Sequence, residues 1–193
     1  RDAIFPDMSI EDNITIPIMN KISRLGFIDR KKQAELVDKY IQMLKIKTPN
    51  KEQLIKFLSG GNQQKCIIAR AMCCDPEIII LDEPTAMLDP LGRQDILNVI
   101  TQLNKKEGVT IVLITHYMEE VIHADKVFVM DKGKVVMEGK PRDIFSQVEQ
   151  LKKLRLDVPQ VTELAYELRK SGLDIPLGIL TREELIKALA GGV

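Results

Sequence analysis

Apolar residues recur every three or four positions along the first third of the chain, and this spacing predicts helices. We expect residues 9–58 to be helical, with Ser9 as a capping residue and Pro17 as the cause of a kink or a later start. Asp29 is expected to cap a second helix over residues 30–45, and Thr48-Pro49-Asn50 is expected to break it. The apolar positions of that second helix are Ala34, Val37, Ile41 and Leu44.

The pattern changes after Gly61, where helices alternate with short apolar runs. Such alternation is typical of a parallel sheet covered by helices, so an α/β fold is predicted. The predicted strands are residues 77–81 and 109–115, and the predicted helices are residues 63–74, 91–105 and 118–122.

The last third adds a hairpin and further helices. Residues 126–131 and 134–138 are expected to pair as short strands, because Lys132-Gly133 between them is a hairpin signal. The helices predicted after the hairpin are residues 141–154, 160–170 and 181–189, with Pro159 and Pro176 between them.

Composition argues against several classes of protein. Lys and Arg total 28, as do Asp and Glu, and Trp is absent, so neither bulk positive charge nor an aromatic platform favours nucleic-acid binding. No apolar run approaches the roughly 20 residues of a membrane helix. The first residues do not resemble a secretory signal, and without an initiating Met the sequence is expected to begin partway through a longer protein.

The three cysteines, Cys66, Cys73 and Cys74, are odd in number and lack a CxxC spacing, which argues against a disulfide framework or a zinc site. Cys66 and Cys73 are seven residues apart on one face of a predicted helix. We therefore expect buried, reduced thiols.

Two carboxylates follow the first predicted strand. Asp82 and Glu83 come directly after an apolar run, at the carboxyl end where open α/β sheets bind ligands. Asp82 suits Mg²⁺, which prefers one or two carboxylates together with water and phosphate oxygens. Glu83 suits a residue that orients or deprotonates a water for attack on a γ-phosphate. The alternative is an ordinary surface Asp-Glu pair that closes a strand.

A serine and two glycines open the helix that precedes this strand. Ser59, Gly60 and Gly61 would expose backbone N–H groups to an anion at the positive end of the helix dipole. Alone, this is a common kind of helix start. The succession of residues 58–65, a helix, and a strand that ends in Asp82-Glu83 is much rarer.

The order of these motifs resembles the ABC ATPase family. Residues 58–61 are similar to its signature motif, residues 78–82 to its Walker B strand and residues 86–89 to its D-loop. The resemblance implies that Glu83 is the catalytic glutamate and that His116 is the switch histidine at the γ-phosphate. It also implies that Asp82 holds Mg²⁺ through water. The residues that it implies for nucleotide binding are Ser59, Gly60, Gly61, Asn62 and Asp89.

Two subfamilies are discernible in the sequence. Residues 1–84 are similar to the second cassette of ribose-type sugar importer ATPases. Residues 85–193, and 156–165 above all, resemble energy-coupling-factor ATPases, which power vitamin and metal-ion uptake. In that group a short helical C-terminal extension helps to pair two ATPases, and residues 146–193 fit this role. A natural mosaic, an engineered chimera and a misassembled reading frame all agree with the pattern.

The resemblance implies the anatomy of a partial P-loop NTPase of the ABC-cassette type. Residues 1–75 would form a helical signature subdomain, 76–145 an α/β core and 146–193 a helical extension. ATP and Mg²⁺ are the implied cofactors. A second ABC ATPase subunit and transmembrane transporter subunits are the implied partners, with a small-molecule substrate bound by other subunits and no nucleic acid. The implied location is peripheral, on the cytoplasmic face of the cell membrane.

One family element has no match in the 193 residues, because GxxxxGK[ST] does not occur. The loop that cradles phosphates is therefore absent from this sequence. Family members build each nucleotide site from the phosphate loop of one cassette and the signature of the other. We expect this chain to supply a signature to a partner's site and to be inactive as an ATPase alone. His123 matches no motif and is expected to be a partly exposed helix residue.

Three functions remain open. The first is an ATPase subunit of an importer, of the energy-coupling-factor type or alternatively a monosaccharide importer. The second is a non-hydrolysing remnant that only pairs with a complete ATPase. The third, a soluble ABC ATPase of DNA repair or translation, is disfavoured by the lack of sustained heptads. Without the family's N-terminal strands, a strand edge and an apolar sheet face are expected to be exposed.

Overall fold

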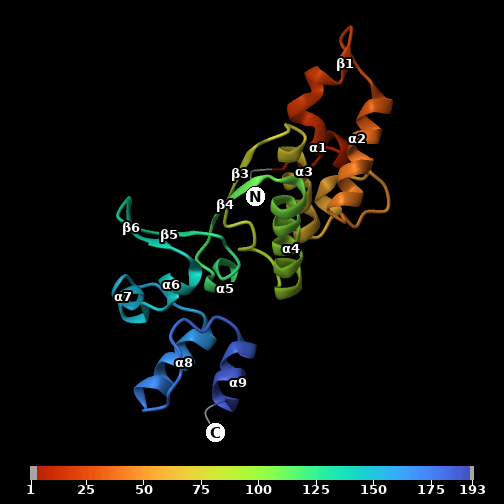
Figure 1. Cartoon of the computed structure of the whole chain (residues 1–193). Helices are drawn as coiled ribbons and strands as arrows, with labels where there is room; N and C mark the ends of the chain where they lie inside the picture. Colours follow the sequence, from red (N-terminus) through yellow and green to blue (C-terminus); the bar gives the residue numbers. More distant parts are fainter. Residues whose placement is uncertain (1–3, 192–193) are drawn as a thin grey trace. The chain divides into compact units, whose positions relative to one another are not determined.

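The computed structural model describes residues 4–191, and the chain divides into two compact units, one through Ile114 and one from Thr115 (Figure 1). About half of the described residues are helical. The three predicted regions, divided at residues 75/76 and 145/146, follow from the family resemblance and do not correspond to these two units. That division stays a prediction.

The first unit begins with two capped helices, as the sequence predicts. Ser9 caps α1 (Ile10–Thr15), where its Oγ accepts a hydrogen bond from the Asp12 backbone N–H at 3.0 Å. Pro17 lies in the 3₁₀ helix η1 (Ile16–Lys21), so the chain tightens where a kink was expected. Asp29 caps α2 (Arg30–Met43) by accepting from the Lys32 N–H.

The prediction of helix over residues 9–58 is wrong at residues 23–28, which form a hairpin of β1 (Ser23–Arg24) and β2 (Phe27–Ile28). The break predicted at residues 48–50 is confirmed, since residues 46–54 are irregular up to the 3₁₀ helix η2 (Ile55–Phe57). The buried stripe of α2 is also rotated slightly from the expected one: Gln33, Val37 and Tyr40 are buried, whereas Ala34 and Ile41 are only partly so.

Two parallel strands and two long helices complete the first unit. Strands β3 (Ile78–Asp82) and β4 (Thr110–Ile114) pair in parallel from Ile78 opposite Thr110 to Asp82 opposite Ile114. Helix α3 (Gly60–Met72) precedes β3, and α4 (Pro90–Glu107) connects the strands. Gly108 ends α4 in the left-handed conformation at φ 72°, a common C-terminal device. The predicted α/β fold is confirmed here.

Helices cover only one face of this two-stranded sheet. Ile79 and Leu81 are buried in a core that they share with apolar residues of α1, α2, α3 and α4. On the opposite face Ile78 and Ile80 are exposed, as are Val112 and Ile114 of β4. The prediction of a covered sheet therefore holds for one face, and the other shows the expected exposed apolar surface.

A buried polar cluster fixes α3 against α1. The Asn13 side chain is fully buried, and its Oδ1 accepts from the Phe5 backbone N–H at 2.9 Å and from Arg70 Nη2 at 2.8 Å. Its Nδ2 donates to the carbonyl oxygens of Phe5, Met8 and Ser9. Arg70 Nε also donates to the Asn13 carbonyl at 2.6 Å. One buried side chain thus joins the backbone of residues 5–9 to Arg70 of α3.

The second unit contains the predicted hairpin. After α5 (Met118–Val121), strands β5 (Val127–Asp131) and β6 (Lys134–Gly139) pair antiparallel, with an irregularity between Val129 and Met130. Lys132 and Gly133 turn the chain at φ 48° and 75°, as their sequence predicts.

Four short helices follow the hairpin. The single helix predicted over residues 141–154 is wrong, since α6 (Pro141–Phe145) and α7 (Val148–Lys153) are separated at Ser146 and Gln147. Helices α8 (Gln160–Lys170) and α9 (Arg182–Ala190) form as expected. Arg142 ties α6 to α9, because its guanidinium donates to the Gly178 carbonyl at 2.6 Å and to Glu184 Oε1 at 2.5 Å. None of the helices within residues 4–191 has the length and apolarity required to span a bilayer.

Replacement of Asn13 by Ala is expected to lower the free energy of unfolding by about 3 kcal/mol, because it strands the Phe5 N–H and removes a partner of the Arg70 guanidinium. Urea denaturation measures the loss. The matched control is Asn98→Ala on the exposed side of α4, which should shift stability by no more than about 0.5 kcal/mol. Equal effects of the two substitutions would remove the structural role assigned to Asn13.

Candidate functional site

The turn that opens α3 leaves the first N–H groups of the helix without a side-chain cap. Ser59 occupies the capping position in extended conformation, but its hydroxyl does not accept from the helix backbone. It accepts instead from Asn62 Nδ2 at 2.9 Å, while Asn62 Oδ1 accepts from the Lys47 N–H at 2.8 Å. Ser59 and Gly60 are exposed. An anion at this helix end would meet donors and the positive end of the dipole.

The glycines of this turn allow close approach by the segment before α4. A Cβ built on Gly60 would lie 3.3 Å from Leu88 Cδ2, tighter than ordinary contact. At Gly61 the nearest atom would be the Gly92 Cα at 3.9 Å, so the space beside it stays open. Glycine at position 60 therefore lets Leu88 pack directly against the helix start.

The Asp89 side chain caps α4. Its Oδ1 accepts from the Gly92 N–H at 2.8 Å, and a Cβ on Gly92 would lie 2.6 Å from that oxygen. Only glycine fits at position 92 while Asp89 keeps this geometry.

The turn and the segment before α4 line one open concavity of ≈ 350 Å³. The structure thus brings together the five residues predicted for nucleotide binding. The residues that line the concavity are Lys47, Ser59, Gly60, Gly61, Asn62, Lys65, Met87, Leu88, Asp89, Gly92 and Asp95.

Sequence reasoning gave Lys65 no role at this site. Its side chain is only 6% exposed, and Nζ lies 3.4 Å from both Asp95 Oδ2 and the Lys45 carbonyl oxygen. The available signal was its position four residues after Gly61, on the same helical face. Its partner Asp95 follows 30 residues later, so the pair is visible only in the fold.

Asp82 and Glu83 lie at the carboxyl end of β3, as predicted, and both are exposed. Glu83 leaves the strand in the left-handed region at φ 43°, and its N–H donates to the Ile114 carbonyl at 2.9 Å. A non-glycine residue pays roughly 1–2 kcal/mol for this conformation. Its carbonyl accepts from the Ala86 N–H at 3.2 Å, which starts the turn toward Asp89.

This strand end can hold Mg²⁺ only with help from other ligands. Within residues 4–191 no group of three or more His, Cys, Asp or Glu side chains is placed to bind a metal. Mg²⁺ commonly keeps several waters and takes one or two carboxylates plus phosphate oxygens, so the donor set fits a Mg²⁺ that arrives with a nucleotide.

His116 lies in the second unit, whereas Asp82 and Glu83 lie in the first. Its exposed ring lies against Tyr117, with ring centroids 4.2 Å apart. His123 is exposed in a turn two residues after the end of α5, so the prediction that it lies in a helix is wrong.

The cysteines are free thiols that differ in burial. Burial raises the pKa of Cys66 to about 12, and it does the same for the partly buried Cys73. These thiols therefore stay protonated at neutral pH and are poor nucleophiles. Cys74 is exposed, so the expectation of buried thiols is wrong for that residue.

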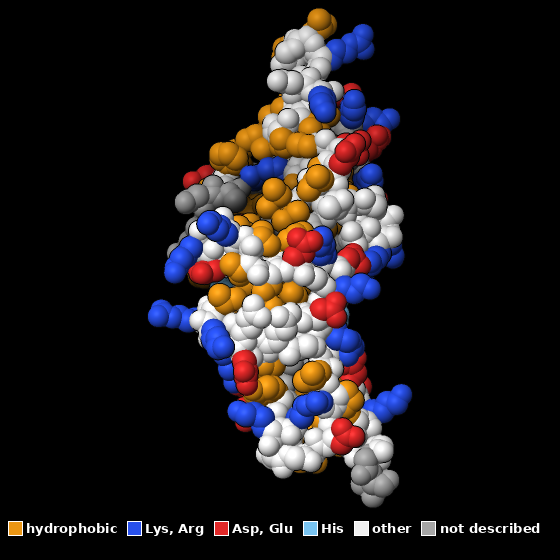
Figure 2. Space-filling model, turned by 60° about the vertical axis from the view of Figure 1, so that its left-hand side comes forward, with side chains coloured by type: hydrophobic (Ala, Val, Ile, Leu, Met, Phe, Trp, Pro, Cys, Tyr) orange, Lys and Arg blue, Asp and Glu red, His pale blue; other side chains and the backbone are white. Residues whose placement is uncertain are grey.

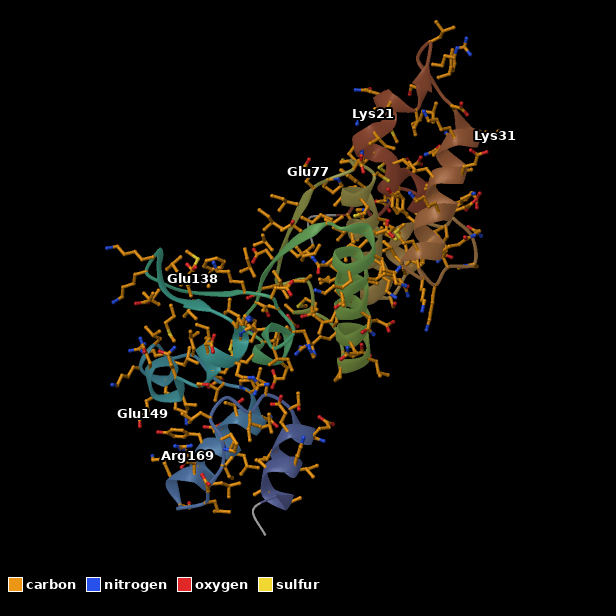
Figure 3. All side chains as sticks on the ribbon, in the orientation of Figure 1. Lys21, Lys31, Glu77, Glu138, Glu149 and Arg169 are labelled. Carbon is orange, nitrogen blue, oxygen red and sulfur yellow. The ribbon has the colours of Figure 1, made fainter. Side chains whose placement is uncertain are left out.

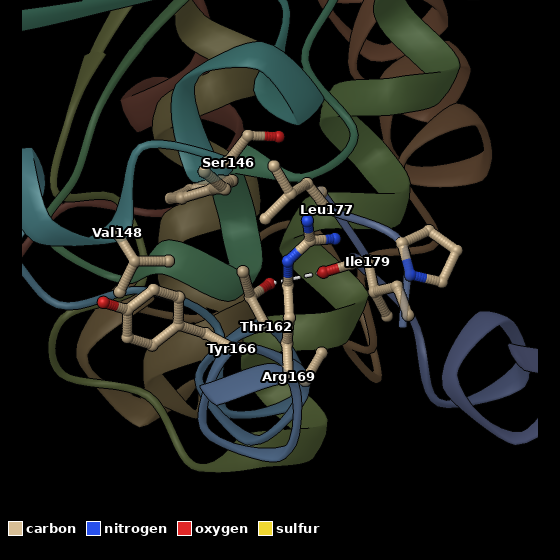
Figure 4. Close-up of a pocket in the computed structure, with 11 residues that line it drawn as sticks. Ser146, Val148, Thr162, Tyr166, Arg169, Leu177 and Ile179 are labelled. Carbon is tan, nitrogen blue, oxygen red and sulfur yellow. Dashed lines mark hydrogen bonds between the residues drawn. The ribbon is translucent and has the colours of Figure 1, made fainter. Parts of the chain in front are cut away.

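A second cavity, within the second unit, is too small for a nucleotide. Its volume is ≈ 10 Å³, and it lies among Ser146, Tyr166 and Arg169 and their neighbours (Figure 4). Thr162 Oγ1 donates across it to the Ile179 carbonyl at 2.6 Å. Space of this size holds about one water, so the cavity is a feature of packing.

Comparison with known proteins finds similar sequences over parts of the chain. Residues 1–86 match the family model described as ABC transporter. The energy-coupling factor transporter ATP-binding protein EcfA1 of Caldanaerobacter subterraneus is 59% identical over 131 residues, which cover 68% of this chain and 47% of that protein. The corresponding protein of Clostridium novyi is 58% identical over 133 residues, covering 69% and 48%. The chain spans about half the length of the curated relatives it matches.

Solved structures show the same fold. The cbiO1 structure from Clostridium perfringens, part of the ABC transporter complex cbiONQ, matches with a TM-score of 0.65 and 27% identity over 86% of this chain and 62% of that one. A dimeric ATP-binding cassette bound to ADP and Pi matches with a TM-score of 0.61 and 27% identity over 72% and 59%. The fold is that of an ABC-cassette P-loop NTPase, represented in part.

The left-handed backbone at Glu83 predicts an unusual order of stabilities. Glu83→Gly should be more stable than Glu83→Ala by about 1 kcal/mol, because glycine adopts φ 43° without steric cost. At Glu35, in the middle of α2, the order should reverse by a similar amount. Chemical denaturation of the four variants tests the sign, and the same order at both positions would contradict the conformation of Glu83.

Proposed function

We propose that this chain is part of the ATP-hydrolysing subunit of an ABC-type importer of the energy-coupling-factor class. The observation that carries the proposal is the concavity shared by the exposed helix start at Ser59–Asn62 and the segment that ends at Asp89. It presents backbone N–H groups and a helix dipole to an incoming anion. The similarity to energy-coupling factor transporter ATP-binding proteins supports the choice of transporter class.

In this proposal the residues of the concavity bind nucleotide that a second subunit holds. Ser59, Gly60, Gly61 and Asn62 would contact the terminal phosphate of ATP through N–H groups and side chains. Asp89 would act indirectly, since its carboxylate caps α4 and thereby fixes the turn beside them. Lys65 and Asp95 also line the concavity, and we assign them, like Asp89, an indirect role in holding it in place.

The strand end supplies the hydrolytic residues. Asp82 would hold Mg²⁺, in part through water, and Glu83 would orient and deprotonate the attacking water. Glu83 leaves the strand in the left-handed conformation and is exposed, so its carboxylate is accessible to water. We assign His116 to the γ-phosphate from its position in the motif order, where it matches the family's switch histidine.

In this proposal the nucleotide site is divided between two subunits. The sequence contains no GxxxxGK[ST] motif, so within these residues no loop cradles the β- and γ-phosphates. A second ABC ATPase subunit would supply that loop to the shared site. Transmembrane subunits would carry the small solute, and the ATPase would be peripheral on the cytoplasmic face of the membrane.

Two alternatives keep specific support. The similarity of residues 1–84 to ribose-type importer ATPases favours a sugar importer, and it remains a prediction. A non-hydrolysing remnant that pairs with a complete ATPase would need only the signature concavity, which this chain has.

Glu83→Gln is expected to lower kcat for ATP about 100-fold or more when the chain is joined to an N-terminal segment that carries a phosphate loop, because general base catalysis contributes that much. The matched control is Glu77→Gln, an exposed carboxylate just before β3 at the opposite end of the strand (Figure 3). The control should keep full turnover. If Glu83→Gln also keeps it, the assignment of Glu83 is wrong.

The chain alone is expected to bind Mg-ATP with a dissociation constant above about 1 mM, because it lacks the phosphate loop. Equilibrium dialysis with labelled nucleotide measures this. Micromolar binding without a partner would contradict both the shared site and the remnant alternative.

A further inference from the structure

Two highly exposed hydrophobic side chains lie at the β1–β2 hairpin. Leu25 is 92% exposed and Phe27 is 80% exposed. Figure 1 shows the hairpin projecting beyond α1 and α2, and Figure 2 shows hydrophobic and basic side chains together at that end. The ATPase proposal gives this hairpin no role.

The turn is built against its own sequence preference. Arg24 pairs with Phe27, so Leu25 and Gly26 form a two-residue turn with φ 52° and 83°. Asn or Asp is favoured at the first position of such a turn, since a bulky side chain is sterically penalised there. Leu25 adopts this unfavourable conformation although its side chain gains almost no burial. Stability of the fold therefore does not explain Leu25.

Positive charge surrounds these two side chains, although the whole chain is neutral. Residues 21–32 carry five basic residues and one acidic residue, Asp29, which caps α2. Arg30 lies 3.6 Å from Glu11 and 3.7 Å from Asp12, so its charge is partly offset. The other four are exposed and form no ion pair within residues 4–191: Lys21, Arg24, Lys31 and Lys32.

One of the basic side chains, Arg24, lies beside the turn, opposite Phe27, and the others lie on the elements that flank the hairpin. Lys21 ends η1 before β1, and Lys31 lies in the first turn of α2 after β2. In Figure 3 the two lie on opposite sides below the hairpin. The apolar side chains of the hairpin thus have one cation beside them at the turn and others at the base of the hairpin.

We infer that the β1–β2 hairpin is a contact site for an anionic lipid bilayer. Leu25 and Phe27 enter the boundary between head groups and acyl chains, and the flanking cations bind lipid phosphates. Two side chains on a protruding turn suit a fluid surface, whereas a protein partner of standard size would need an interface of about 800 Å² on this side. The inference goes beyond the proposed ATPase function and stands on separate residues.

Sedimentation of the chain with lipid vesicles tests this inference. Binding to phosphatidylcholine vesicles with about 30% phosphatidylglycerol should exceed binding to phosphatidylcholine alone at least tenfold, and should fall with added salt. Equal binding to both vesicles, or none to either, would overturn the inference.

Leu25→Asn separates binding from folding. It places a favoured residue in the turn, so thermal stability should be kept or raised while vesicle affinity falls about tenfold. Lys31→Gln should lower affinity for anionic vesicles about fivefold. The control, Ile186→Gln, removes another exposed apolar side chain, on α9, and should leave binding unchanged. Unchanged vesicle binding by the Leu25→Asn variant would overturn the inference. So would self-association of the unmodified chain, if Leu25→Asn abolished it, because the hairpin would then bind a second copy of the chain.

Discussion

The packing of one face of β3 against α3 and α4 is the constraint on which the candidate site depends. Strand residues alternate, so burial of Ile79 and Leu81 directs Ile78, Ile80 and Asp82 to the other face. The same core holds α3 and α4 together, which brings Leu88 against Gly60. One apolar contact layer therefore fixes both the direction of the strand-end carboxylates and the concavity at the start of α3.

Several residues of the proposed site adopt arrangements that are locally unfavourable. Glu83 adopts a conformation that glycine would adopt more easily, and Ser59 leaves its helix uncapped although its hydroxyl occupies the capping position. Lys65 is nearly buried and is matched only by a distant carboxylate and a carbonyl. Conflicts between local preference and structure gather at functional sites, because selection for function outweighs their cost there.

Features that depend on neighbouring residues were predictable from the sequence. The caps at Ser9 and Asp29, the hairpin at Lys132-Gly133 and the strand that ends at Asp82 follow from local signals. The turn at Leu25-Gly26 was missed because leucine is not a turn signal. The break after Phe145 was missed because neither glycine nor proline marks it. Motif order predicted which residues of the concavity gather, whereas the Lys65–Asp95 pair required the fold.

The strand end at Asp82-Glu83 and the start of α3 differ in how completely the rest of the chain packs around them. Strands β3 and β4 are apolar on both faces, a composition typical of sheets covered on both sides, yet the helices of the unit cover one face. The carboxylates at the strand end therefore lie on a sheet with one uncovered apolar face. Helix α3 is held differently. Arg70 in its last turn donates to Asn13 of α1, and Lys65, nearer its start, lies 3.4 Å from Asp95 of α4. The turn at Ser59–Asn62 is thus held by contacts of α3 with other helices, whereas the strand end borders an exposed apolar face, so the two parts of the proposed site differ in structural support.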